Sequence, residues 1–266
     1  MAAKLRDLPK GLLSALRYQS HSGRLIRQHR ALRRQNFQRA NLLHPLVLVA
    51  ASYTALYLLL PEVTRAWGVL FGFWLDRLGW PALLATVPED VFGVFLFALA
   101  VPEAVARQPG TAEIGVTALL ALGAMLASYL AGRRRWLPLV YFVWGCAAIQ
   151  LVACAYFYVA PYRYPHTLAS HLADGLRAGT SLLLVVPLLL SFTYYVFDHS
   201  LPKKLLGTLV MFAALAICIP VLYLVHAALV LECSLVIMPL LFTVFGTLYQ
   251  IALFVAIYAW VVSWEP

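Results

Sequence analysis

Long apolar runs separated by short polar stretches dominate the chain after residue 43. A membrane-spanning helix needs about 20 mostly apolar residues. Seven runs approach or exceed this length, and they are 44–60, 91–106, 112–131, 136–160, 179–197, 205–229 and 235–262. The pattern predicts an all-α fold, a polytopic integral membrane helical bundle.

A further apolar stretch, 66–84, has two interpretations. It carries Asp76 and Arg77 in its middle and three tryptophans, so it fits either a span or a helix on the membrane surface. If it spans, the basic loops at 133–135 and 203–204 lie on the same side as the basic N-terminus. Because basic loops accumulate in the cytoplasm, we expect about eight spans with both termini cytoplasmic. Seven spans with a lateral surface helix are the alternative.

Composition supports the membrane assignment. The 266 residues are 63% hydrophobic and 12% charged, and the mean hydropathy is +0.82. Soluble domains are about 45–50% apolar and about 25% charged. These values exclude a soluble enzyme, a disordered tail and a fibrous repeat. The four cysteines form no C-x-x-C pair and indicate no disulfide framework. The alanine-, leucine- and arginine-rich composition is compatible with a bacterial inner membrane.

The net charge of +9 lies in the N-terminal segment, where residues 1–39 hold ten basic residues and one acidic residue. Apolar positions recur among the arginines. We therefore expect a basic cytoplasmic amphipathic segment over 1–42, lying on the inner membrane surface, ahead of a transmembrane helical domain over 43–266. Anionic lipid head groups or a partner protein are the expected contacts. Nucleic acid is not, because aromatic side chains that stack on bases are sparse. The contacting residues are predicted to be Arg24, Arg27, Arg30, Arg33 and Arg34.

Small residues mark a possible helix contact in the run 112–131. Gly123, Ala127 and Ala131 recur at a spacing of four. Small side chains let helix backbones approach closely in a membrane. We expect this run to be packed inside the bundle or at an oligomer contact.

Polar residues after the N-terminal segment gather in the stretch 161–178 and at 226–232. Ionisable groups near or within a bilayer are candidates for function. The expected polar site consists of His171, Asp174, His226 and Glu232. Both stretches lie on the outer face in the eight-span arrangement, and a shared site requires His171 and His226 to be close together. No metal-binding or catalytic motif is present, and no cofactor is expected.

These observations favour a non-catalytic inner-membrane subunit that assembles with other membrane or cytoplasmic proteins in an envelope synthesis, secretion or transport complex. A transporter or channel for a neutral or lipid-like solute is the second hypothesis. A di-haem b-type electron-transfer subunit is the third, with His44 and His199 on the inner side and His171 and His226 on the outer side. A membrane-embedded transferase acting through 161–178 is the fourth.

Overall fold

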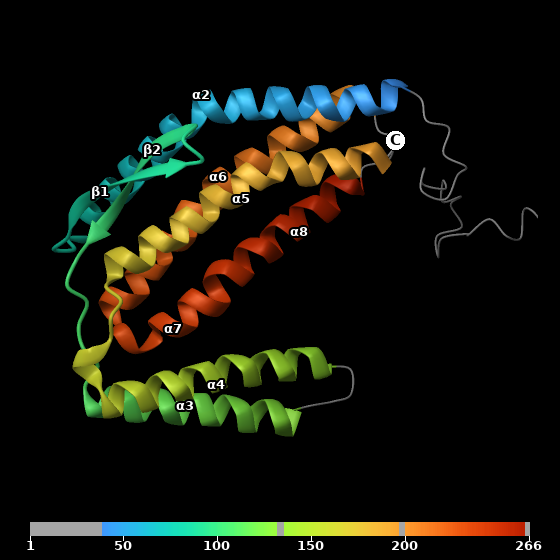
Figure 1. Cartoon of the computed structure of the whole chain (residues 1–266). Helices are drawn as coiled ribbons and strands as arrows, with labels where there is room; N and C mark the ends of the chain where they lie inside the picture. The colour runs from blue at the N-terminus through green and yellow to red at the C-terminus, as the bar shows by residue number, and fades with distance from the viewer. Residues whose placement is uncertain (1–38, 132–135, 197–199, 264–266) are drawn as a thin grey trace, which may run out of the picture.

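The computed structural model describes residues 39–131, 136–196 and 200–263, and side chains from residue 43 onward except those at 195–196. The predicted contact residues of the basic segment 1–42, Arg24, Arg27, Arg30, Arg33 and Arg34, lie outside the described residues. The described chain is mostly helical (Figure 1). Its elements are α2 (Arg39–Leu78), β1 (Leu83–Val91), β2 (Phe95–Glu103), α3 (Thr111–Ala131), α4 (Leu137–Val159), η4 (Pro161–Arg163), α5 (Leu168–Val196), α6 (Leu201–Glu232), η5 (Leu235–Ile237), α7 (Met238–Leu240), η6 (Leu241–Leu248) and α8 (Tyr249–Val262).

Six helical segments in the described residues are long and apolar enough to cross a membrane, rather than eight or seven. They are Leu43–Leu78, Thr111–Ala131, Leu137–Val159, Leu168–Tyr194, Leu201–Glu232 and Leu235–Val262. The last segment combines η5, α7, η6 and α8 without an intervening loop, and η6 is a π-helix. A polytopic integral membrane protein is therefore the architecture that the structure supports.

The run 66–84 forms no separate span. Its residues up to Leu78 continue α2, a 40-residue helix with Pro45 and Pro61 inside it. A helix of this length extends about 60 Å, roughly twice the apolar core of a bilayer. The later part of α2 runs beside the hairpin of β1 and β2 (Figure 1).

The predicted span 91–106 is wrong, because this region forms a β-hairpin. β1 and β2 pair antiparallel, with Val91 opposite Phe95. Phe92 and Gly93 have φ values of 61° and 68°, and the Gly93 amide donates to the Asp90 carboxylate over 2.7 Å. This left-handed turn favours a hairpin over a continuous helix. Alternate β2 residues, Phe97, Leu99 and Val101, are buried, which is the period of two of a strand with one covered face.

The main core lies between α2, the hairpin, α5 and α6. Phe71, Leu99, Leu172 and Leu215 are at most 1% exposed there. The close packing of α2 on β2 depends on Gly68, since a Cβ at this position would lie 2.8 Å from the Cβ of Ala100. The hairpin is therefore part of a folded layer with its own core.

The close contact between helices lies on α5 instead of on the run 112–131. Gly175 and Gly179 form a G-x-x-x-G pair, and a Cβ at Gly179 would lie 2.6 Å from Ile219 on α6. In α3, by contrast, only 11% of the most apolar 18-residue stretch of the helix is buried. No atom outside the helix backbone and the neighbouring residues lies within 4 Å of a Cβ built at Gly123. The expectation that α3 is packed inside this chain's bundle is wrong, because α3 packs on α4 as a helical pair set apart from the other helices (Figure 1).

Candidate functional site

The structure brings together two of the four predicted polar residues. His171 lies in the first turn of α5, and His226 lies near the end of α6. The His171 Nε2 atom is 3.2 Å from the His226 Nδ1 atom. The stretch 161–178 is therefore not an exposed loop throughout, because its second half is the start of α5 and its His171 is 3% exposed.

The two imidazoles meet end to end. Their centroids are 5.4 Å apart and their planes differ by 25°. The centroid distance exceeds the distance between the two nitrogens by about twice the distance from an imidazole centre to its own nitrogen. The two nitrogens therefore lie close to the line that joins the ring centres. This is the geometry of an N–H···N hydrogen bond, in which one imidazole donates and the other accepts. We refer to His171 and His226 as the histidine dyad.

Aromatic rings enclose the dyad. Tyr223 on α6 contacts His226 with centroids 5.1 Å apart, and Phe242 on η6 contacts His171 with centroids 5.8 Å apart. His226 is 1% exposed, and its Nε2 atom is buried without a hydrogen-bond partner. A buried polar atom without a partner is uncommon and requires an explanation.

Gln250 and Gly175 fix the Tyr223 ring beside the dyad. The Gln250 amide nitrogen on α8 donates to the Tyr223 hydroxyl over 2.7 Å and to the Gly175 carbonyl over 3.3 Å. A Cβ at Gly175 would lie 2.1 Å from the Tyr223 ring, so only glycine leaves room for it. Three helical segments thus converge on this site.

Asp174 and Glu232 do not join the histidines in direct contact. Asp174 accepts a hydrogen bond from Arg177 over 3.0 Å, and Arg177 also pairs with Glu89 of β1. Glu232 accepts a hydrogen bond from the Trp80 indole over 3.2 Å. The Asp174 bond therefore stays within α5, whereas Glu89 joins β1 to α5 and Glu232 joins the end of α6 to the residue Trp80 just ahead of the hairpin.

The dyad gives no support for a haem between its rings. A bis-histidine haem needs an iron between the two coordinating nitrogens, whereas these nitrogens face one another at hydrogen-bond distance. His44 lies on α2, and its proposed inner partner, His199, lies outside the described residues. Within the described ranges, no group of three or more His, Cys, Asp or Glu side chains is placed to hold a metal ion.

A separate apolar groove lies where α4 meets α7. Its volume is about 410 Å³, and it is lined by Ala148, Ile149, Val152, Ala153, Tyr156, Phe157, Tyr164 and Pro239. Burial raises the pKa of Tyr164 above its ordinary value.

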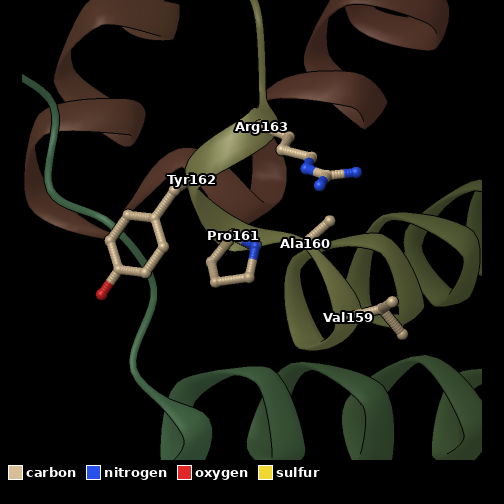
Figure 2. Close-up of a pocket in the computed structure, with 5 residues that line it drawn as sticks. All are labelled: Val159, Ala160, Pro161, Tyr162 and Arg163. Carbon is tan, nitrogen blue, oxygen red and sulfur yellow. The ribbon is translucent and has the colours of Figure 1, made fainter.

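A second pocket of about 360 Å³ follows directly along the chain, over 159–163. Figure 2 shows Tyr162 and Arg163 extending from η4 in opposite directions. The Tyr156 hydroxyl donates to the Arg163 carbonyl over 2.9 Å and so links the walls of the two pockets. The pocket linked to the apolar groove therefore includes a cationic residue, Arg163.

Sequence reasoning missed Tyr223, Gln250 and the groove. Gln250 lies in an apolar run, where an isolated amide indicates a hydrogen bond between helices without identifying its partner. The G-x-x-x-G pair at 175–179 is the signal that would have located the close contact of α5 with Tyr223.

Comparison with known proteins yields no relative. No protein-family model, no curated protein and no solved structure matches this chain.

Proposed function

We propose that this chain is a non-catalytic, polytopic inner-membrane subunit that assembles with partner proteins through the α3–α4 pair. The observation that carries the proposal is the exposure of α3. Leu119, Leu120 and Leu130 are 68–75% exposed, although they lie on a helix long enough to span a membrane.

The α3–α4 pair is joined to the other helices at one end. At that end, the Gln150 amide donates to the Val236 carbonyl over 2.9 Å, and Arg107 donates to the Cys233 carbonyl over 3.0 Å. Along its length, α3 packs on α4, where the Trp144 indole donates to the Ser128 hydroxyl over 3.1 Å. Among the residues that the structure describes, no helix covers the outward face of α3.

Open space at small residues supports a helix as the occupant of that face. Neither Gly115 nor Gly123 has any atom within 4 Å of a Cβ built on it. Small residues at a helix surface permit the close backbone approach by which membrane helices associate, whereas lipid tails gain nothing specific from them. A helix of a partner protein therefore fits this face. Envelope synthesis, secretion and transport complexes are the proposed settings.

We further propose an orientation of the chain in the membrane. If each of the six candidate spans crosses once, the loops at 132–136 and 197–200 lie on the same side as the N-terminus. Arg133, Arg134 and Arg135 lie in the first loop, and Lys203 and Lys204 follow the second loop at the start of α6. The positive-inside tendency then puts both termini in the cytoplasm and the hairpin on the outer side of the membrane.

Purification of the tagged full chain in mild detergent tests the assembly. We expect at least one protein to accompany the wild type in fixed proportion. Gly123→Leu should reduce its recovery about tenfold, because a bulky side chain separates the backbones. Ala213→Leu is the matched control, since Ala213 is exposed on α6, outside the α3–α4 pair. Equal recovery with both variants would contradict the proposal.

The groove between α4 and α7 favours a second candidate function, the handling of a lipid-like solute. Its volume falls in the range of ligand pockets, about 300–1,000 Å³. An acyl chain fits the apolar lining, and Arg163 suits an anionic head group. Ala153→Leu narrows the groove and should reduce transfer of a fluorescent anionic lipid between vesicles. Unchanged transfer would remove this candidate.

A further inference from the structure

The histidine dyad has a chemical capability that the assembly function does not use. Its two rings are almost fully buried, and they come from α5 and α6, which are distant in sequence. We propose that His171 and His226 form a proton-binding site that takes up one proton per pair and transfers the positive charge to the enclosed His226 ring.

The hydrogen bond between the rings supports this proposal. Each neutral imidazole carries one N–H, so one N–H of the pair occupies the bond and the other lies on an outer nitrogen. The outer nitrogens are His171 Nδ1 and His226 Nε2. Of these two, His226 Nε2 is buried without a partner in hydrogen-bond geometry, although the backbone carbonyl of Phe245 on η6 lies near this ring. The pair thus joins the water-facing start of α5 to an enclosed atom.

Proton transfer along this bond needs no movement of heavy atoms. The pair begins with one hydrogen on each Nε2 atom. A proton from hydronium forms an N–H at His171 Nδ1, and the His171 Nε2–H bond breaks as an N–H forms at His226 Nδ1. His171 is then neutral, and His226 is an imidazolium whose Nε2–H is the enclosed donor. One proton has entered, and the positive charge has moved from the outer to the inner ring.

Charged and titratable side chains lie near both rings. Asp174, one turn along α5, places a carboxylate near His171, and it is shared with Arg177, which is also paired with Glu89 of β1. His166 in the preceding loop is a second basic group near His171. On α6 the titratable neighbours are Tyr223, which contacts His226, and Glu232, which bonds to Trp80. η6 contributes no titratable side chain.

Entry of the proton is consistent with the position of His171. The residues just before it, Thr167 and Ser170, form exposed hydrogen bonds with one another at the start of α5. Water therefore reaches the first turn of the helix. His226, in contrast, is 1% exposed, and its ring contacts Tyr223 and the Nε2 atom of His171.

Nitrogen NMR of the full chain in lipid nanodiscs, with ¹⁵N-labelled histidine, tests the site directly. We expect a spin coupling between two imidazole nitrogens across the N–H···N bond, and uptake of one proton by these two rings together as the pH falls. Both the spin coupling and the proton uptake are measured in the wild type, so this test does not require that any substituted chain folds.

Variants then test the pairing. His226→Gln should move the titration midpoint of His171 by about one pH unit or more, since coupled groups titrate as a pair. His44→Gln, on α2, should leave it unchanged. The proposal is overturned if no coupling joins two rings, if each ring takes up its own proton independently, or if neither is protonated between about pH 4 and pH 8.

Discussion

Arg177 on α5 donates two hydrogen bonds to Glu89 on β1, from Nε over 2.9 Å and from Nη2 over 2.6 Å. A two-bond ion pair of this kind fixes orientation as well as distance. The Glu89 side chain is 10% exposed and the Arg177 side chain 48% exposed, so solvent screens the pair in part. The contact holds the hairpin against the helix that carries His171.

Loss of this ion pair should loosen the hairpin. Glu89→Gln keeps the shape and removes the charge, and we expect a destabilisation of about 1 kcal/mol. Hydrogen exchange of the β1 and β2 amides in the full chain measures the effect. Glu62→Gln breaks the exposed Arg65 pair on α2 and should leave hairpin exchange unchanged. Equal exchange of the hairpin amides in the wild type and in both variants would show that the ion pair of Arg177 with Glu89 does not hold the hairpin.

The second prediction concerns the contact of α5 with Tyr223. Gly175→Ala places a methyl group 2.1 Å from the Tyr223 ring, so we expect a loss of stability of about 2 kcal/mol or more. Gly123→Ala meets no atom within 4 Å and should be neutral or slightly stabilising, because alanine is the better helix former. Thermal unfolding in detergent compares the two variants. Similar midpoints would argue against the close packing of α5 on α6.

The helical regions were largely predictable from the sequence because hydrophobic run length reports on spanning helices directly. The runs 112–131 and 136–160 correspond closely to α3 and α4. The region 66–106 was not predictable in this way. Apolar residues there fill a buried strand face, and a run of such residues is equally compatible with a helix until the turn at Phe92 and Gly93 is recognised.

The candidate site was predictable only as a set of residues. His226 and Glu232 stood out because ionisable groups are rare in apolar runs, and His171 and Asp174 because they lie in the polar stretch 161–178. The structure places the two histidine rings in contact, whereas Asp174 and Glu232 bond elsewhere. Spacing along the chain cannot distinguish these cases, because the contact depends on how α5 crosses α6.

The third prediction concerns the basic N-terminal segment. Replacement of Arg24, Arg27, Arg30, Arg33 and Arg34 with Gln should weaken association with anionic vesicles or with a partner. Each basic residue near an anionic surface contributes roughly 1 kcal/mol, less where salt screens it. Vesicle sedimentation of the isolated segment and partner recovery with the full chain are the measurements. Unchanged values in both would contradict the role assigned to these arginines.

The fourth prediction fixes the orientation. A cysteine placed at position 134 should resist a membrane-impermeant thiol reagent added outside intact cells. A cysteine at position 109, in the connection between β2 and α3, should react with it. These results follow if each of the six candidate spans crosses once and both termini are cytoplasmic. Labelling at 134 from outside would exclude this orientation.

In-cell photocrosslinking from α3 tests the assembly role most directly. A photoreactive residue at Leu119, which is 70% exposed, should form a discrete crosslinked product with one protein. The same residue at Leu209, 65% exposed on α6, should yield no such product. A discrete product from Leu119 alone is the result that the account predicts. Only lipid adducts at Leu119, or identical products from both positions, would contradict it.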